Sequence, residues 1–493
     1  MHQTILMYNP ISTSPGKQRL PMSLLAIASM LRDDYDFELC DGNLIADPAT
    51  HLIARAQATD ARLLAMSVMP GPQLQQAVSV VRAIKYALPD LTIIWGGYFP
   101  SHHYELCLKS GYVDYVIVGQ GEVAFRRFVD CFYESGTMRD VPSLAYYEGD
   151  ELVITPKAPI APLENLPRYP YHKIEMEPYV GKSYLGERVL SHHSSWGCPF
   201  ACNFCAVVPL ARQRWSAESA ERVGETMRYL KGQYQIDGME FHDMDFFVKE
   251  DRSVMIAEQM MDLQLNWWGL GRVDTLMGYD DSSYQALADS GLKMVFMGAE
   301  AGDDETLKLM NKGGRSGVDQ TLAIVERMAR FDIVPELSFV LGTPPDPVAS
   351  IESTIQFIRH VKAINPATEI ILYMYTPVAN FESTLMQEAI AQGFQFPQTL
   401  EEWASDEWAE KALRRSPGTP WSDDPIRRKI RDFETVINAF YPTVTDQRLH
   451  GAMRTLLKTV SGWRYQLEFY SAPYELKLLQ RLIHYRRPET TGF

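Results

Sequence analysis

Short apolar runs alternate with helix-like segments along most of the chain, and this alternation limits the folds that the sequence can adopt. In the first third, five such runs lie at residues 4–10, 36–42, 62–70, 91–97 and 113–122. The segments between them, such as residues 22–32 and 73–88, carry apolar residues at helical spacing. Strands alternating with helices are typical of parallel βαβ units, so we predict an α/β fold that begins with a Rossmann-like, doubly wound sheet.

The predicted strands end in residues that suit a sharp turn or a close backbone approach. Ligands of open α/β sheets bind beyond the carboxyl ends of the strands, so this edge is predicted to be a binding site. No Gly-x-Gly-x-x-Gly motif follows the first strand, which disfavours a nicotinamide cofactor. The strand-end candidates are Pro10, Asp41, Ser67, Gly96, Gly97 and Gly119.

The stretch from Trp95 to Phe125 resembles the cobalamin-binding domain that precedes many radical enzymes, and the likeness covers about residues 1–140. The resemblance implies that the strand-end candidates, together with Gly121 and Glu122, face the corrinoid and its nucleotide tail. Related domains of the methionine-synthase kind use a loop histidine as the lower ligand of cobalt. In the corresponding loop, "CDGNLIAD", Asn43 occupies that place, so no histidine of this loop would bind cobalt.

Three of the six cysteines, Cys198, Cys202 and Cys205, are crowded into one segment with spacings of four and three residues. So few cysteines in a long chain do not form a disulfide framework, which favours metal ligation in a reducing compartment. A zinc site needs a fourth ligand, which His192 or His193 can supply, and a redox disulfide leaves one cysteine unexplained. An iron–sulfur cluster held by three thiolates, with one open iron, fits the spacing best.

The Cys-x-x-x-Cys-x-x-Cys spacing resembles the signature of the radical S-adenosylmethionine (SAM) superfamily. The resemblance implies a [4Fe-4S] cluster whose open iron binds the amino and carboxylate groups of SAM, and a 5′-deoxyadenosyl radical formed from it. It further implies that Phe204 packs on the adenine and that Asp243, with Asp245 beside it, lies near the SAM amino group. Arg272 would support the carboxylate or ribose. Glu300 would contact SAM as well, although Ala301 replaces the serine that usually follows.

Six strand–helix units follow the proline-rich connector, which indicates a partial (β/α)6 TIM-like barrel with its functional residues at the strand carboxyl ends. Helix-like segments then continue to the end of the chain, and we expect them to cap the barrel mouth. The predicted segments are a cobalamin-binding domain (1–145), a proline-rich linker (146–187), a radical SAM barrel (188–380) and a helical C-terminal domain (381–493).

The formal charge of −15 disfavours a general nucleic-acid binder. No apolar run reaches the length of a transmembrane helix and no signal peptide is visible, so a cytoplasmic protein is expected. The last 69 residues, from Pro425, carry 12 Lys and Arg against 6 Asp and Glu. Their basic, amphipathic helices leave peripheral membrane contact open as an alternative.

The whole arrangement resembles the cobalamin-dependent radical SAM enzymes, which include methyltransferases and an anaerobic cyclase of chlorophyll biosynthesis. This resemblance implies transfer of a methyl group from methylcobalamin to an unactivated carbon. Two alternatives stay open: oxidative cyclisation of a tetrapyrrole, and a corrinoid-binding sensor without catalysis. The implied partners are a small-molecule, lipid or tetrapyrrole substrate and an external one-electron reductant of the flavodoxin or ferredoxin type.

Overall fold

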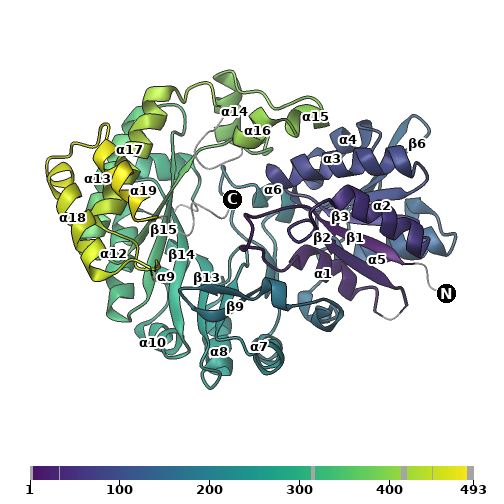
Figure 1. Cartoon of the computed structure of the whole chain (residues 1–493), viewed down its shortest axis with the longest axis horizontal. Coiled ribbons are helices and arrows are strands. Elements are labelled where there is room, and N and C mark those ends of the chain that lie inside the picture. Colours follow the sequence, from purple (N-terminus) through teal and green to yellow (C-terminus); the bar gives the residue numbers. More distant parts are fainter. Residues whose placement is uncertain (1–3, 33, 313–316, 412–418, 447, 486–493) are drawn as a thin grey trace.

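The computed structural model describes residues 4–32, 34–312, 317–411, 419–446 and 448–485. Two α/β units lie side by side, each built on its own seven-stranded sheet. In Figure 1 the N-terminal unit is on the right and the second unit on the left, with the last helices at its outer end.

The first sheet has the strand order β2-β1-β3-β4-β5-β6-β7, in which the first five strands run parallel. This order confirms the predicted doubly wound sheet, and the strand order reverses between β1 and β3, where such folds bind ligands. The parallel strands are β1 (Ile5–Asn9), β2 (Phe37–Asp41), β3 (Leu63–Ser67), β4 (Thr92–Gly96) and β5 (Tyr115–Ile117). The helices are α1 (Met22–Ser29), α2 (Pro48–Thr59), α3 (Pro72–Ala87), α4 (Tyr98–Lys109) and α5 (Glu122–Tyr133).

An antiparallel hairpin, β6 (Leu144–Glu148) and β7 (Glu151–Ile154), extends this sheet past residue 145, where the linker was expected to begin. Gly149 makes the turn with φ 63°, a left-handed conformation that glycine adopts without strain. The Gly-Asp pair between two apolar runs is a hairpin signal that the sequence analysis missed. The connector that follows contains three short 3-10 turns, at Leu163–Asn165, Tyr171–Lys173 and Glu177–Tyr179.

The second sheet has the order β16-β15-β14-β13-β12-β9-β8, and its first six strands are parallel. This confirms the six-stranded partial barrel. The strands are β9 (Gly186–His192), β12 (Gly238–Phe241), β13 (Asn266–Arg272), β14 (Leu292–Glu300), β15 (Val334–Leu341) and β16 (Glu369–Met374). A short antiparallel strand, β8 (Gly181–Ser183), was not predicted and closes the edge at β9.

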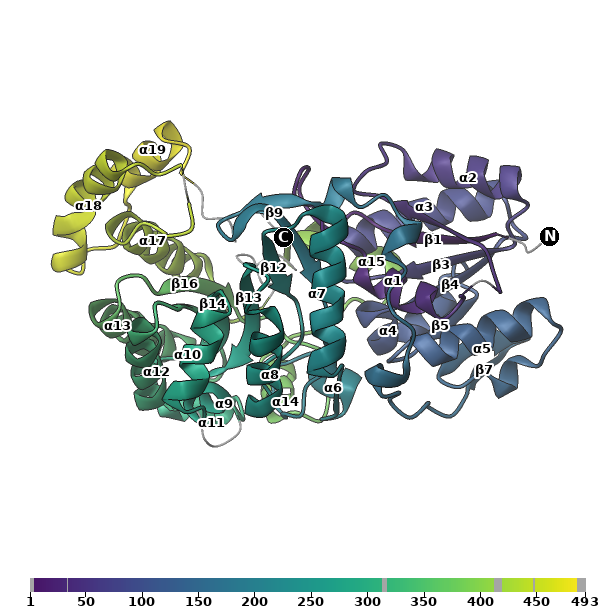
Figure 2. The same cartoon turned by 90° about the horizontal axis from the view of Figure 1, so that it is seen from below.

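The barrel helices cover the outer face of this sheet, as Figure 2 shows. They are α7 (Ala220–Tyr234), α8 (Glu250–Met260), α9 (Val273–Met277), α10 (Asp281–Asp289), α11 (Asp304–Leu309), α12 (Val318–Arg330) and α13 (Pro347–Ile364). A small ribbon, β10 (Ser195–Gly197) with β11 (Trp215–Ala217), stands apart from the sheet and brackets the cysteine segment and helix α6 (Val207–Ala211).

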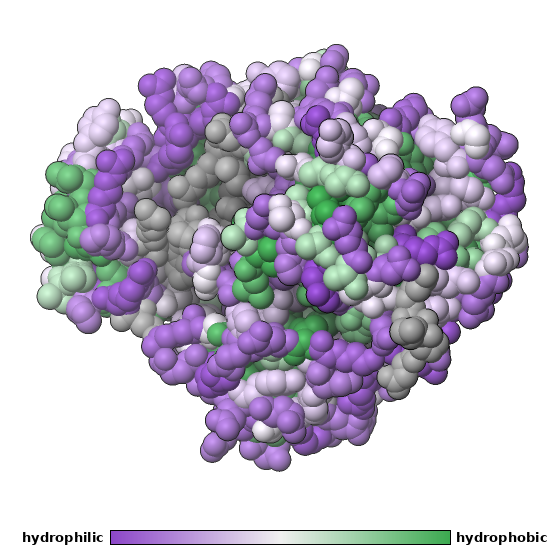
Figure 3. Space-filling view, turned by 45° about the vertical axis from the view of Figure 1, so that its right-hand side comes forward, coloured by the Kyte–Doolittle hydropathy of each residue, from purple (hydrophilic) through white to green (hydrophobic). Residues whose placement is uncertain are grey.

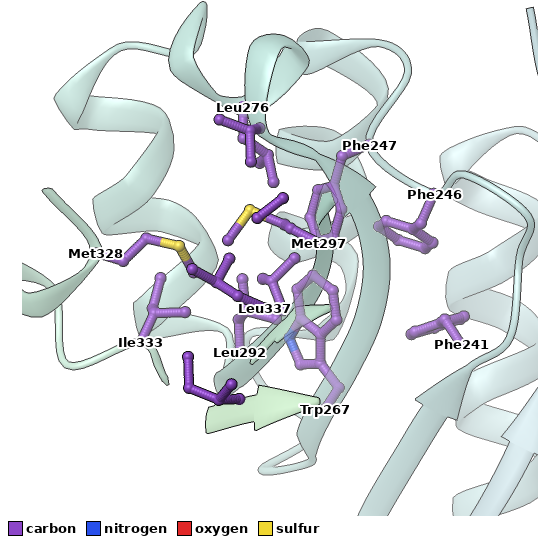
Figure 4. Packing of buried hydrophobic residues seen from close by; sticks show 14 of the residues in the cluster. Phe241, Phe246, Phe247, Trp267, Leu276, Leu292, Met297, Met328, Ile333 and Leu337 are labelled. Atoms are coloured by element: carbon purple, nitrogen blue, oxygen red, sulfur yellow. The ribbon is translucent and has the colours of Figure 1, made fainter. Parts of the chain in front are cut away.

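The core between barrel and helices is made by residues that alternate along the strands. Trp267, Met297 and Leu337 come from three neighbouring strands and are fully buried. In Figure 4 they pack together with Phe246 and Phe247 of the loop after β12. Alternate residues of the same strands therefore face the barrel interior, where ligands of such barrels bind.

The C-terminal helices do not form one cap over the barrel mouth, so that expectation is wrong. α14 (Thr384–Ala391), α15 (Leu400–Trp403) and α16 (Asp406–Lys411) follow β16, and Leu400 and Trp403 are buried in the core of the first domain. α17 (Asp424–Phe440) packs on the outside of α13, and α18 (Gly451–Gln466) and α19 (Tyr474–Leu482) pack on α17. The reason is the apolar face of α17, whose Phe433 and Ile437 join the barrel core.

The last two helices leave several large apolar side chains on the surface, among them Leu467, Tyr474 and Leu482. Apolar side chains gather at the left edge of Figure 3, where the C-terminal helices lie. Within the described residues, every helix is too short or too polar to cross a bilayer.

We predict that Trp267→Ala destabilises the barrel by about 3–5 kcal/mol, because it removes a fully buried aromatic side chain. The urea midpoint of the barrel transition measures this loss. The matched control is Tyr86→Ala, at a side chain that is 93% exposed, which should change stability by less than about 0.5 kcal/mol. Equal effects of the two substitutions would contradict the packing described here.

Candidate functional site

The three clustered cysteines lie on a loop that the rest of the barrel holds firmly. Asn203 donates from its backbone N–H to the Met310 carbonyl at 2.9 Å and from its side chain to the Leu309 carbonyl at 3.0 Å. Asn311 donates in return to the carbonyl of Ala201 at 2.9 Å. The loop between β10 and α6 is therefore fixed to the chain that follows β14.

Gly197, directly before Cys198, is required by this arrangement. Its φ is 85°, and a Cβ atom there would lie 2.2 Å from the carbonyl oxygen of Arg214. The backbone directly before Cys198 therefore passes so close to the backbone at Arg214 that only glycine fits at position 197.

The three thiols are free and largely shielded from solvent. Burial, followed by the nearby Asp245 carboxylate, raises the pKa of Cys198 to about 12, and burial raises the pKa of Cys205. Cys198 and Cys205 are therefore neutral thiols without a metal. Metal ions bind thiolates, so loading must release protons.

The spread of the cysteines fits a multi-iron cluster better than a single ion. Among the described residues, one group of three metal-ligand atoms lies within 4.8 Å of one another, Glu38, Cys40 and His51, and Glu38 there is paired with Arg55. The clustered cysteines do not form such a group. His192, a zinc ligand candidate, contacts the Tyr171 hydroxyl at 2.8 Å through Nδ1 and Glu218 at 3.4 Å through Nε2.

Arg272, at the end of β13, points at the cysteine loop. It donates to the Asp274 carboxylate at 2.9 and 2.8 Å and to Cys202 Sγ at 3.1 Å, and its guanidinium lies 3.8 Å from the centre of the Phe200 ring. The guanidinium therefore ties the end of β13 to the cysteine loop through a cysteine side chain. The family resemblance predicts that Arg272 contacts SAM. The structure shows in addition that it donates a hydrogen bond to Cys202, a predicted cluster ligand.

Glu300, at the end of β14, forms a buried ion pair with Lys312. The pair requires Gly298, because a Cβ there would lie 1.8 Å from a carboxylate oxygen of Glu300. The Lys312 ammonium lies 5.6 Å from the centre of the Phe204 ring, so the predicted adenine-packing residue and Glu300 meet through this lysine. The Lys312 carbonyl accepts a hydrogen bond from Arg272 at 2.6 Å, which joins both ion pairs into one network.

The two aspartates after β12 have different surroundings. Asp243 accepts hydrogen bonds from the Ser194 N–H at 3.1 Å, the Ser194 hydroxyl at 2.8 Å and the Ser195 hydroxyl. Both carboxylate oxygens of Asp245 are buried, and neither has a hydrogen-bond partner among the described residues. Burial raises the pKa of Asp245 to about 7, with Arg272 and Lys312 acting in the opposite direction. The carboxylate of Asp243, which the resemblance places near the SAM amino group, is thus already engaged by protein groups, whereas that of Asp245 is not.

The predicted cobalamin residues lie together at the carboxyl edge of the first sheet. Gly97 has φ 92°, and a Cβ there would lie 2.7 Å from the Ser67 hydroxyl. Gly119 has φ 95°, and its N–H donates a hydrogen bond to the Ser101 hydroxyl at 3.0 Å. A Cβ at Gly119 would meet nothing within 4 Å, so part of this edge is open, and its glycines let a ligand approach the backbone closely.

Asp41 and Asn43 organise the loops of this edge. Asp41 accepts hydrogen bonds from Asn9 at 3.1 Å, from Asn43 at 2.7 Å and from the Tyr179 hydroxyl of the connector at 2.8 Å. The Asn43 side chain in turn accepts from the Ser12 N–H at 2.9 Å. The Asn43 side chain is thus engaged by neighbouring groups of this edge.

Gly121 is the N-cap of α5, Glu122 is its first residue, and Pro10 directly follows β1. Glu122 is buried in the first turn of the helix, after Gly121, and burial raises the pKa of its carboxyl. The Pro10 carbonyl accepts a hydrogen bond from Gln73 at 3.2 Å.

The carboxyl edges of the two sheets face each other. α4, which begins at Tyr98, packs on α6, the short helix that starts two residues after Cys205. Arg19, from the loop after β1, pairs at 3.0 Å with Glu240 on β12 inside the barrel. Figure 1 shows the same meeting of α4 and α6 between the units. A ligand on the first edge therefore faces one on the second.

Comparison with known proteins agrees with this division. Residues 10–129 match the B12 binding domain, and residues 194–358 match the Radical SAM superfamily. These matches imply cobalamin, SAM and a [4Fe-4S] cluster as cofactors, and the open first edge, the three spread thiols and the unpartnered Asp245 fit these groups.

Two curated relatives differ in activity. An uncharacterised methyltransferase of Pyrococcus horikoshii is 26% identical over 69% of this chain and 73% of its own length. The anaerobic magnesium-protoporphyrin IX monomethyl ester cyclase of a Synechocystis strain is 24% identical over 41% of this chain and 42% of its own. The solved structure of the radical SAM methyltransferase TsrM from Kitasatospora setae, with cobalamin and a [4Fe-4S] cluster, has a TM-score of 0.62 and 17% identity, covering 76% of this chain and 72% of that one. That structural likeness shows a shared fold.

We predict that Asp245 makes the cofactor-free protein less stable as pH rises. The pKa of its carboxyl is raised in the folded state from 3.8 to about 7, so the folded protein holds a proton that the unfolded chain has lost. Stability therefore falls between about pH 4 and pH 7, by at most about 1.4 kcal/mol per pH unit. Urea titrations across this range should show that Asp245→Asn removes this part of the slope and stabilises the protein at pH 8. Asp243→Asn, which breaks existing hydrogen bonds, should destabilise it instead.

Proposed function

Since the chain joins a B12-binding domain to a radical SAM domain, we propose that it is a cobalamin-dependent radical SAM methyltransferase acting on an unactivated carbon. The observation that carries this proposal is the meeting of the two strand edges, with the cysteine loop on one and the open glycine edge on the other. The methyltransferase relative supports the reaction class.

When bound, the cofactors supply a deoxyadenosyl radical that removes hydrogen from the substrate and a methyl group on cobalt that replaces it. The residues of this chain hold these groups in order. Cys198, Cys202 and Cys205 would hold the cluster, Asp245 would receive the SAM ammonium, and Phe204 would lie beside the adenine. The hydrogen bond from Arg272 to Cys202 Sγ would fix the position of one cluster ligand.

The barrel interior is the proposed substrate site. Its walls combine apolar and polar groups, including Trp268, whose indole N–H donates to Glu336 at 2.9 Å, and His242, which contacts Glu240 at 2.9 Å. Arg19 closes this space from the side of the first domain. Exclusion of water by the two facing domains protects a radical from side reactions. The substrate class remains a small molecule, lipid or tetrapyrrole, and an external one-electron donor is required.

Replacement of the clustered cysteines should abolish SAM cleavage, because each supplies a cluster ligand. We expect Cys198→Ala, Cys202→Ala and Cys205→Ala to lose bound iron and sulfide, cluster absorbance and 5′-deoxyadenosine formation. Cys107→Ala and Cys131→Ala alter buried thiols of the first domain and should keep all three. Normal iron content in the loop variants would show that another group holds the cluster.

Methylation is separated from its alternatives by SAM with a deuterated methyl group. The enzyme, loaded with cluster and cobalamin and reduced, should add the three deuterium atoms of that methyl to its substrate. A product that lacks the label and has lost hydrogen would indicate a cyclase-type oxidation instead. Absence of 5′-deoxyadenosine with every candidate substrate would favour a corrinoid-binding sensor.

A further inference from the structure

We propose that the exposed turn behind the cysteine loop is the docking surface for an acidic one-electron donor protein of the flavodoxin or ferredoxin type. The inference rests on the proposed function, since a cluster in this loop must be reduced before SAM is cleaved. In the step itself the donor is oxidised by one electron and the cluster is reduced by one, with no atom or proton transferred.

Four exposed cations gather here from three segments far apart in sequence. Arg212 and Arg214 belong to the turn between α6 and β11, Lys157 comes from the connector after β7, and Lys249 precedes α8. We call them the cationic patch. Among the described residues, no ion pair joins any of the four to a carboxylate. Positive charge without a local counter-charge is a binding determinant for an acidic partner.

The members of the patch are close together. Lys249 lies beside this turn, since its ammonium is 5.9 Å from the ring centre of Trp215, the residue after Arg214. Lys157 is near enough to Arg212 that repulsion between the two charges, after burial, lowers the pKa of Lys157. Lys157 and Lys249 therefore lie near the turn that carries Arg212 and Arg214, although they come from other segments.

The patch lies directly behind the cluster ligands. Arg212 ends α6, which starts two residues after Cys205, and donates its N–H to the Val208 carbonyl at 2.9 Å. The Arg214 backbone packs against Gly197, next to Cys198, so closely that no side chain fits between them. A donor seated on this turn is separated from the cysteines by a single layer of backbone.

The chemistry of the surface suits a transient redox partner. Val207, Val208 and Leu210 of α6 stay partly exposed just before the turn that carries Arg212 and Arg214, so apolar and cationic groups adjoin in the sequence of this segment. The chain as a whole has a charge of −15 and would repel an acidic donor at most other places. Charges at the rim of an interface raise the association rate and determine where the partner docks, and they contribute less to the binding affinity. In Figure 2, α6 lies at the edge of the molecule, between α4 and α14.

The test measures binding of a bacterial flavodoxin and, in a separate arm, of a [2Fe-2S] ferredoxin to the cluster-loaded protein at low and moderate salt. The patch variants are Arg212→Glu with Arg214→Glu, and Lys157→Glu alone, which lies on another segment and guards against misfolding of the turn. The control is Lys458→Glu with Arg481→Glu, the same change of charge at exposed residues of α18 and α19.

We expect each patch variant to bind its donor about ten-fold more weakly at low salt, with a reduced dependence on salt, while the control binds like the wild type. Weakening in one arm alone supports docking and identifies the donor type. SAM cleavage driven by dithionite should be the same in all variants, because a small reductant needs no docking surface. Unchanged donor affinity in both patch variants, or equal weakening in the control, overturns the proposal. Failure of the proposed function would be distinct, since dithionite would then yield no 5′-deoxyadenosine in any variant.

Discussion

The buried ion pairs behind the cysteine loop are the interaction on which the site depends. Arg272 binds Asp274 and Cys202, Lys312 binds Glu300, and the Arg272 hydrogen bond to the Lys312 carbonyl makes them one unit. Charges so deeply buried persist only when they are paired and hydrogen-bonded. The loop between β10 and α6 is short and has little core of its own, so this network and the contacts of Asn203 determine where its sulfur atoms lie.

A second constraint is that both domains use the same end of their strands. Parallel strands bring the residues that follow them to one edge, whatever the sequence between them. The α4–α6 contact and the Arg19–Glu240 pair turn these edges toward each other. The hydrogen bond from Tyr179 to Asp41 ties the connector to the first edge, so the connector fixes the orientation of the domains as well as joining them.

The sequence predicted the parallel strands because each is a buried apolar run between helical segments. The hairpin β6–β7 was not predicted, because it lies beside the prolines of the connector, which favour a linker. Its Gly-Asp turn is the sequence signal that favours a hairpin there. The placement of the C-terminal helices could not be predicted, because periodicity shows that α17 has an apolar face but not which surface receives it. Only the fold shows that Phe433 packs on the barrel while Trp403 enters the core of the first domain.

The site residues were predictable by type and position, but their hydrogen-bond partners were not. Asp243 and Asp245 stand two residues apart after one strand, and only the positions of Ser194 and Ser195 decide which carboxylate is already satisfied. That outcome distinguishes the two carboxylates chemically. Asp274 and Glu300 are each paired with a cation, Arg272 and Lys312, whereas both oxygens of Asp245 lack a hydrogen-bond partner among the described residues and its pKa is raised to about 7. A cationic ligand group beside Asp245 would lower the pKa of this carboxyl, so the proposed binding of an ammonium group there is coupled to release of a proton.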